Sequence, residues 1–207
     1  MRKTKRVYKI LQGLYLDQDN IKFVFVEEVP LDDFRLFIES LTTERETWSL
    51  DMELYDREMC EGKDNIETWY NVQSRYNKMI AINEITKGPK RRVIQQTIFA
   101  KHKGNVIGFV SGKSLHTGVC TTCGVSNPEV VEISYVVKKE HQGNGIGTHF
   151  LSLIENYISE KNFNIMTANY FEDNIASDRA FSKAGWDRID KIGDKVVVRK
   201  NMKKVIK

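Results

Sequence analysis

The chain has 207 residues, of which 41% are hydrophobic, 10% aromatic and 29% charged, with a formal net charge of +4. This length allows one domain with a sizeable core, and the composition is typical of globular proteins rather than of disordered or fibrous ones. No apolar run approaches the ~20 residues that span a bilayer, and the basic start Met1–Arg6 is followed by no apolar signal segment, so we expect a cytoplasmic protein without membrane partners.

Basic residues gather at both ends of the chain. Five lie in residues 1–9 and five in residues 199–207, with no acidic residue in either stretch. Subtracting these ten from the net charge leaves −6 for the remainder. Basic ends bind nucleic acid in some proteins, but we interpret these as solvated ends and expect no nucleic-acid partner. The predicted organisation is a basic extension (1–20), one domain (21–200) and a basic tail (201–207).

The first element that the sequence predicts is a strand at residues 21–26, bounded by a polar turn and by Pro30. A helix follows, for which Asp32 or Asp33 is the expected N-cap. Its apolar residues share one face: Phe34, Phe37, Ile38 and Leu41. This strand and helix are predicted to begin the domain.

Two amphipathic helices are predicted next. Residues 44–67 hold nine carboxylates, and apolar residues recur at helical spacing through this stretch and through residues 66–85. A charged helix face is usually solvated, and attraction of a cationic ligand is the alternative. The stretch 87–90, Lys-Gly-Pro-Lys, ends the second helix.

A hairpin is predicted from strands at 97–100 and 106–110, with Gly104-Asn105 in its turn. The loop after it, residues 111–129, contains Cys120, Cys123 and the nearby His116. Three such side chains could bind zinc, but the sequence has no second Cys-x-x-Cys. We therefore interpret the cysteines as reduced thiols and expect no metal.

A strand, a glycine loop and a helix follow in direct succession. Residues 130–137, Val-Val-Glu-Ile-Ser-Tyr-Val-Val, read as a largely buried strand. Three glycines, Gly143, Gly145 and Gly147, then precede apolar residues at helical spacing. Because the first turn of a helix has free N–H groups and a positive dipole end, this junction predicts an anion site, most simply for a phosphate.

The spacing of the loop narrows the choice of phosphate ligand. A dinucleotide fingerprint needs glycine where Thr148 stands, and the P-loop pattern Gly-Lys-Ser/Thr is absent. The segment from Gln142 to Gly147, Gln-Gly-Asn-Gly-Ile-Gly, resembles the Q/R-x-x-G-x-G/A signature of the GNAT family of N-acetyltransferases.

A second signature follows in the expected order. A strand is predicted at residues 164–170, then a short helix that Asp173 or Asn174 caps and Gly185 ends, and a closing hairpin to Arg199. The stretch from Asn174 to Trp186 resembles the family pattern N-x-x-A-x-x-x-Y-x-x-x-G-F. The resemblance covers residues 95–200 well and the first 90 by element order.

The resemblance implies an α/β (α+β) fold, in which helices flank a mixed, mainly antiparallel sheet that is splayed at the strand that binds acetyl-CoA. Backbone groups of Val136 and Val137 would bind the pantetheine arm and polarise the thioester carbonyl. The pyrophosphate would lie on the loop, and two further side chains would line the cofactor. The implied cofactor-binding residues are Val136, Val137, Gln142, Gly143, Asn144, Gly145, Ile146, Gly147, Thr148, Asn174 and Phe181.

The implied reaction is acetyl transfer from acetyl-CoA to a primary amine of a small molecule, a polyamine or a peptide, by direct attack. Glu132 lies on the central strand, just before the implied acetyl-CoA cleft, and is the candidate general base. The family's usual acid is tyrosine, but Phe181 stands there and cannot donate a proton; Tyr135, Tyr170 or solvent are the alternatives. The missing tyrosine also motivates a second hypothesis, a non-catalytic acyl-CoA-binding module. The acceptor is not identified by the sequence, and a homodimer is left open.

Overall fold

The structure is a computed structural model that describes residues 21–41, 67, 70, 95–114, 130–159, 163 and 165–202. Most of the two predicted helices in residues 44–85 and the cysteine-containing loop lie outside these residues. Glu67 and Tyr70, which are described, are helical as expected. Within the described ranges, no helix combines the length and the apolar character that crossing a membrane requires.

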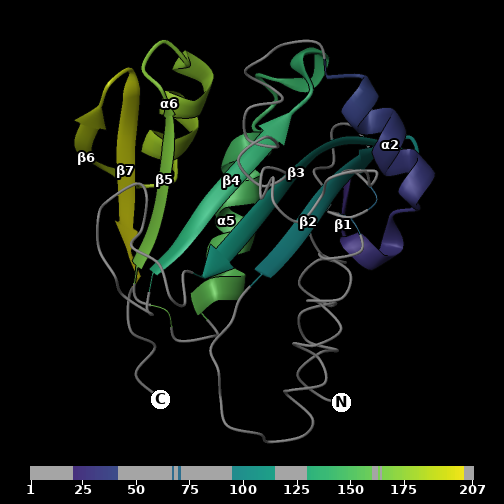
Figure 1. Ribbon diagram of the computed structural model, residues 1–207, viewed down its shortest axis with the longest axis horizontal. Helices are drawn as coiled ribbons and strands as arrows, with labels where there is room; N and C mark the ends of the chain where they lie inside the picture. The colour runs from purple at the N-terminus through teal and green to yellow at the C-terminus, as the bar shows by residue number, and fades with distance from the viewer. Residues whose placement is uncertain are drawn as a thin grey trace, which may run out of the picture. The chain divides into compact units, whose positions relative to one another are not determined.

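Seven strands form one mixed sheet (Figure 1). Their order is β1-β2-β3-β4-β5-β7-β6. The pairs β1–β2, β5–β7 and β6–β7 are antiparallel, whereas β4–β5 is parallel. The predicted fold class, a mixed sheet with flanking helices, is therefore confirmed. The strands are β1 (Ile21–Phe25), β2 (Gln95–His102), β3 (Asn105–Ser114), β4 (Val130–Val137), β5 (Ile165–Phe171), β6 (Asp187–Ile192) and β7 (Lys195–Asn201).

The described residues fall into two compact units. The α2 unit comprises residues 21–41, 67, 70, 96–109 and 136–140, with the helices η1 (Val26–Glu28) and α2 (Leu31–Glu39). Its core is an aromatic cluster of Phe34, Phe37, Phe99 and Phe109, which also takes in Val136 at the end of β4. The helical spacing of the phenylalanines on α2 places them on this buried face.

Two local expectations in the α2 unit were wrong. The helix begins at Leu31 with Pro30 as N-cap, so neither Asp32 nor Asp33 caps it. Both lie in the first turn, where the helix dipole favours negative charge, and the Asp33 carboxylate pairs with Lys101 Nζ at 2.9 Å. The hairpin turn is Lys103-Gly104 rather than Gly104-Asn105, with positive φ at both turn residues (49° and 88°), as a type I′ turn requires.

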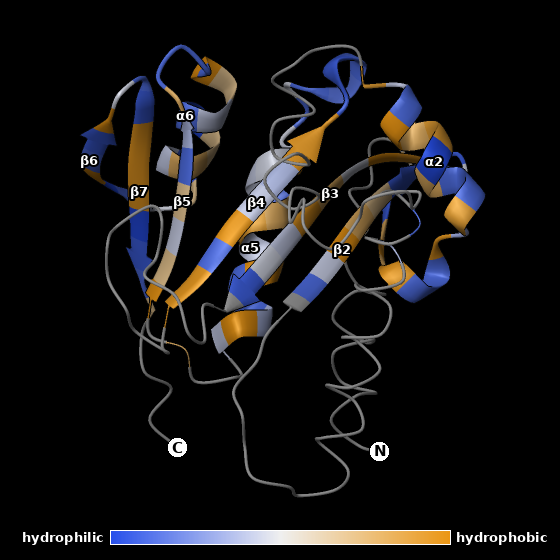
Figure 2. Ribbon diagram, viewed as in Figure 1, coloured by the Kyte–Doolittle hydropathy of each residue, from blue (hydrophilic) through white to orange (hydrophobic). Residues whose placement is uncertain are grey.

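The α5 unit comprises residues 95, 110–114, 130–135, 141–159, 163 and 165–202. Its helices are α5 (Ile146–Ser159) and α6 (Ile175–Lys183). α5 packs closely on the sheet at Gly112, where an added Cβ would lie 3.3 Å from the side chains of Ile133 and Ile154. Along β7, Val196–Val198 form the hydrophobic centre and the ends are hydrophilic, whereas the edge strand β6 is largely hydrophilic (Figure 2). Residues 199 and 200, counted above among the basic ends, belong to β7.

The parallel pair β4–β5 is short and opens toward its carboxyl ends. It joins Val130–Glu132 to Ile165–Thr167, three residue pairs in all. Within the α5 unit β4 continues to Tyr135 and β5 to Phe171 without further pairing, and Figure 1 shows the two strands parting. The strand on which a splay was expected is therefore where the sheet opens. The last residue of β4 that pairs with β5 is Glu132.

Candidate functional site

The loop between β4 and α5 exposes its main chain. A short helix, η3 (Lys139–His141), which the sequence analysis did not expect, leads into it. Gly143 and Gly145 have φ of 81° and 78°, a region that residues with a Cβ rarely adopt. A Cβ added at either glycine would meet no atom within 4 Å. These two glycines are therefore required by backbone conformation and not by packing.

The first helical hydrogen bond of α5 is donated by His149 N–H to the Gly145 carbonyl, at 3.0 Å. The N–H groups of Ile146, Gly147 and Thr148 consequently have no acceptor inside the helix. They lie at the positive end of a 14-residue helix, directly after a run of exposed residues, 142–145. Free amides and a dipole in this arrangement form a site for an anion such as a diphosphate.

Gly147 has a different role from the other two glycines. It lies inside α5, and a Cβ there would stand 3.1 Å from Tyr135 Cε2, closer than packed carbon atoms normally come. Packing therefore explains why residue 147 is glycine, whereas backbone conformation explains the other two. Gly147 allows the Tyr135 ring on β4 to lie directly against the first turn of α5, which holds the start of the helix against the sheet.

Tyr135 also connects β4 to α6. Its hydroxyl donates to Ser177 Oγ at 3.2 Å, and its ring lies 5.7 Å from that of Phe181. Burial raises the pKa of the Tyr135 phenol to about 12. Ser177 stands where the family pattern has alanine and Phe181 where it has tyrosine, so two of the departures from the pattern contact Tyr135.

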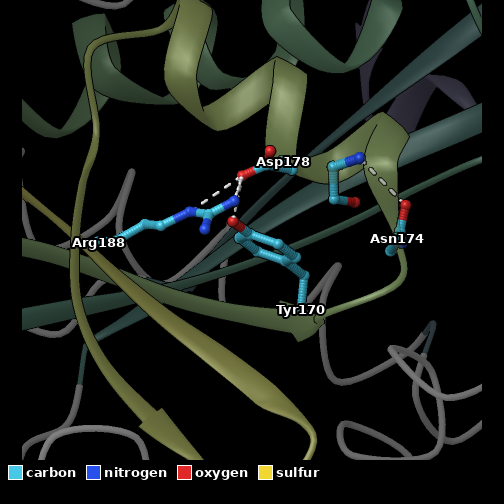
Figure 3. Close-up of polar contacts among 5 residues, drawn as sticks. Tyr170, Asn174, Asp178 and Arg188 are labelled. Carbon is cyan, nitrogen blue, oxygen red and sulfur yellow. Dashed lines mark hydrogen bonds and ion pairs between the residues drawn. The ribbon is translucent and has the colours of Figure 1, made fainter.

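The predicted cap of α6 is Asn174. Its Oδ1 accepts from Ser177 N–H at 3.0 Å, which satisfies one of the free donors at the helix start (Figure 3). At the other end Gly185 has a φ of 74°, and Trp186 N–H donates to the Phe181 carbonyl at 3.0 Å. The Trp186 and Phe181 rings lie 5.0 Å apart, the hydrophobic contact of a Schellman ending.

The remaining predicted residues lie on β4. Glu132 is half-buried and is the last residue that pairs with β5, opposite Thr167. Val136 and Val137 are buried and belong to the α2 unit, where the next residue, Lys138, donates its N–H to the Ile107 carbonyl at 2.9 Å. Within the α5 unit the structure thus brings Gly147, Asn174 and Phe181 around Tyr135 and Ser177.

An ion-pair network on α6 was missed by the sequence analysis. Asp178 Oδ1 accepts from the Tyr170 hydroxyl at 2.6 Å and from Arg188 Nε at 3.2 Å, and Arg188 Nη2 also contacts it (Figure 3). These bonds hold the Asp178 pKa below its usual value, with the Tyr170 hydrogen bond as the largest cause. No motif marks the three residues, since they come from β5, α6 and β6.

Tyr170 is tied into this network and is a poor proton donor. Burial, and secondly its hydrogen bond to Asp178, raise its pKa to about 12. Its ring stacks on Phe181 at 5.5 Å. Tyr135 and Tyr170 both have a pKa of about 12. Each is therefore a weaker acid than an ordinary tyrosine, whose pKa is about 10. Tyr135 and Tyr170 stay candidates for the acid, each with a raised pKa.

The described ranges contain no cluster of side chains suited to bind a metal ion. No group of three or more His, Cys, Asp or Glu side chains is arranged there to hold an ion. Cys120, Cys123 and His116, the residues with zinc-ligand spacing, lie outside the described part of the chain.

Comparison with protein families places this arrangement in a wider context. A family model described as "Acetyltransferase (GNAT) family" matches residues 52–186, which is more than half of the chain. The match includes the glycine loop and the whole of the second signature, residues 174–186. No match was found among curated proteins.

Solved structures share the fold at low sequence identity. The GNAT domain of S. lividans PAT has a TM-score of 0.57 and 16% identity, over 89% of this chain and 92% of that one. A GNAT-family acetyltransferase from Streptococcus pneumoniae has a TM-score of 0.59 and 16% identity, over 88% and 99%. The PaiA N-acetyltransferase from Thermoplasma acidophilum, solved with coenzyme A, has a TM-score of 0.52 and 20% identity, over 87% and 98%.

The Asp178 network predicts a pH-dependent contribution to stability. Replacing Asp178 with asparagine keeps an acceptor for Tyr170 but removes the charge, which we expect to lower the free energy of unfolding by about 1 kcal/mol at pH 7. Because the folded pKa of Asp178 is lowered, this contribution is present above the unfolded pKa of about 4 and is lost as the pH falls through the folded value.

Urea unfolding at a series of pH values measures this difference. The difference in the free energy of unfolding between wild type and Asp178→Asn should disappear in acid. The control is Asp190→Asn, at an exposed position on β6, which should differ from wild type by less than ~0.5 kcal/mol. A gap that is absent at pH 7, or that widens in acid, contradicts the role given to the network.

Proposed function

Since the chain belongs to the GNAT family of acetyltransferases, we propose that it transfers the acetyl group of acetyl-CoA to a primary amine of a small molecule, a polyamine or a peptide by direct attack. Acetyl-CoA-dependent transfer is the activity of the family, and relatives in this fold have been solved with CoA. The amine class of the acceptor is our proposal. The observation that supports acetyl-CoA as the acetyl donor is the set of free main-chain amides at the start of α5.

Those amides suit the diphosphate of CoA. A diphosphate carries its charge on several oxygens, and successive N–H groups at a helix start can each donate to one of them. We assign this role to the main chain of residues 142–148, where Gly143 and Gly145 leave room for close approach. By resemblance to the family, backbone groups of Val136 and Val137 would bind the pantetheine arm, and Asn174 and Phe181 would line it.

In the proposed reaction the amine nitrogen forms a bond to the thioester carbonyl carbon, and the carbon–sulfur bond breaks when the tetrahedral adduct collapses. Glu132 takes up, through water, the proton that the amine nitrogen loses. The oxyanion is stabilised by main-chain N–H groups at the end of β4. The sulfur leaves as thiolate, and solvent supplies its proton, since Phe181 has none to give and the phenols of Tyr135 and Tyr170 are weak acids.

The remaining parts of the proposal concern organisation and location. We propose one catalytic domain over residues 21–200 with basic ends. Three cysteines in 207 residues provide no disulfide framework, which supports a cytoplasmic location. We assign no metal to the reaction, because the attack described above needs only a base and an oxyanion site.

Substituting Gly145 tests the diphosphate site. Alanine at a φ of 78° is strained and should displace the amides that follow it, and we expect the CoA dissociation constant to rise about tenfold or more, since one lost charge-assisted bond has that effect. Isothermal titration of the purified protein with CoA measures it.

Gly193→Ala is the matched control for that experiment. Gly193 also has positive φ (61°) and an open surrounding, but it lies in the β6–β7 turn. It should retain wild-type affinity for CoA. Equal losses in the two variants would show that affinity follows stability and not the loop, and an unchanged dissociation constant for Gly145→Ala would remove the loop from the site.

Replacing Glu132 with glutamine tests the base. We expect turnover at pH 7 to fall about 10²- to 10⁴-fold, the usual contribution of a general base, with CoA affinity unchanged. The rate of the variant should recover toward pH 10, because free amines then lose their proton without help. Acetyl-CoA-dependent thiol release at several pH values measures this, with the exposed Glu172→Gln as control. Unchanged turnover at pH 7 excludes Glu132 as base.

A further inference from the structure

One cross-strand row connects Glu132 with an arginine. Glu132 on β4 pairs with Thr167 on β5, and Thr167 pairs with Arg199 on β7. Residues directly opposite each other in a sheet project from the same face. The three side chains therefore share one face of the sheet, at the place where β4 and β5 begin to part.

This face is the one that points away from α5. The next residues along the strands, Ile133 and Lys200, project from the other face, where Ile133 lies beside Ile154 at Gly112 and Lys200 Nζ pairs with Glu155 at 2.6 Å. Side chains alternate along a strand. Arg199 and Glu132 are thus held on the opposite face from α5.

Among the residues that the structure describes, no carboxylate forms an ion pair with Arg199. Its Nε is buried and has no hydrogen-bond partner in the described part of the chain. Asp187, the next residue in the row on β6, is its nearest acidic neighbour by register, yet it is not within ion-pair distance. By contrast Arg188, one residue further along β6, is fully engaged by Asp178.

A buried N–H donor without an acceptor is unfavourable, so each such group in a native protein calls for an explanation, and a bound ligand is one. A guanidinium presents its donors as a planar fork that matches a carboxylate. We infer that Arg199 binds a carboxylate of the acceptor, so that the acceptor is an amino acid or a short peptide with a free carboxylate; this inference rests on the proposed function.

The geometry of the row sets the size of such an acceptor. Two strand spacings, about 10 Å, separate the backbones of Glu132 and Arg199. Between them lies Thr167, which is fully buried. A small molecule with its amine near Glu132 and its carboxylate near Arg199 spans the row, whereas a polyamine places a positive charge next to Arg199.

Binding to the CoA-saturated protein tests the inference independently of turnover. The probes are amino acids and dipeptides, each compared with its C-terminal amide, and spermidine. We expect carboxylates to bind the wild type roughly 10- to 100-fold more tightly than their amides, and Arg199→Gln to abolish the difference by weakening the carboxylates alone. Arg179→Gln, at an exposed position on α6, should keep it.

Arg199→Lys retains the charge but not the fork, and it serves if the glutamine variant folds poorly. It should keep only part of the preference for carboxylates. The inference is wrong if the wild type binds amides or spermidine as tightly as carboxylates, if it binds no carboxylate, or if Arg199→Gln weakens both members of each pair equally. Failure of the proposed function has a different signature: acetyl-CoA binds, but no amine in the panel is acetylated.

Discussion

The start of α5 is the feature on which the site depends. Its free amides attract an anion only if the helix is held at a fixed place and its first turn stays open. Burial of Ile146 anchors the helix, and contact between Gly147 and Tyr135 fixes its first turn against β4. Gly143 and Gly145 then turn the chain so that the amides remain exposed. The candidate anion site thus depends on the packing of Ile146 and Gly147 and on the backbone conformation that Gly143 and Gly145 allow.

The opening of the sheet provides the second condition. Parallel pairing between β4 and β5 ends at Glu132, after three residue pairs. The strands part there. Asn174 caps α6, and the helix is held against β5 by the stacking of Phe181 on Tyr170 and by the hydrogen bond from Tyr170 to Asp178. Tyr135 spans from β4 to α6 through Ser177. A rigid frame around an opened strand suits a thioester that must be held in one orientation.

Periodic patterns made most of the fold predictable. The strand at 130–137, the buried face of α5, the Asn174 cap and the Gly185 ending follow from spacing and from residues with one strong preference, and the structure has them. The N-cap of α2 was wrong because two adjacent aspartates both suit the first turn. Contacts between distant segments, such as Tyr170–Asp178–Arg188, the Gly147–Tyr135 fit and the row to Arg199, depend on strand order and register, which periodicity does not contain.

The most direct test of the account is to follow the backbone amide signals of the ¹⁵N-labelled protein by NMR during titration with CoA and, separately, with pantetheine, which lacks the diphosphate. CoA should shift the amides of residues 143–148 strongly, and pantetheine should leave them near their free positions. Equal shifts with both ligands, or a CoA complex in which these amides do not move, would contradict a diphosphate site at the start of α5.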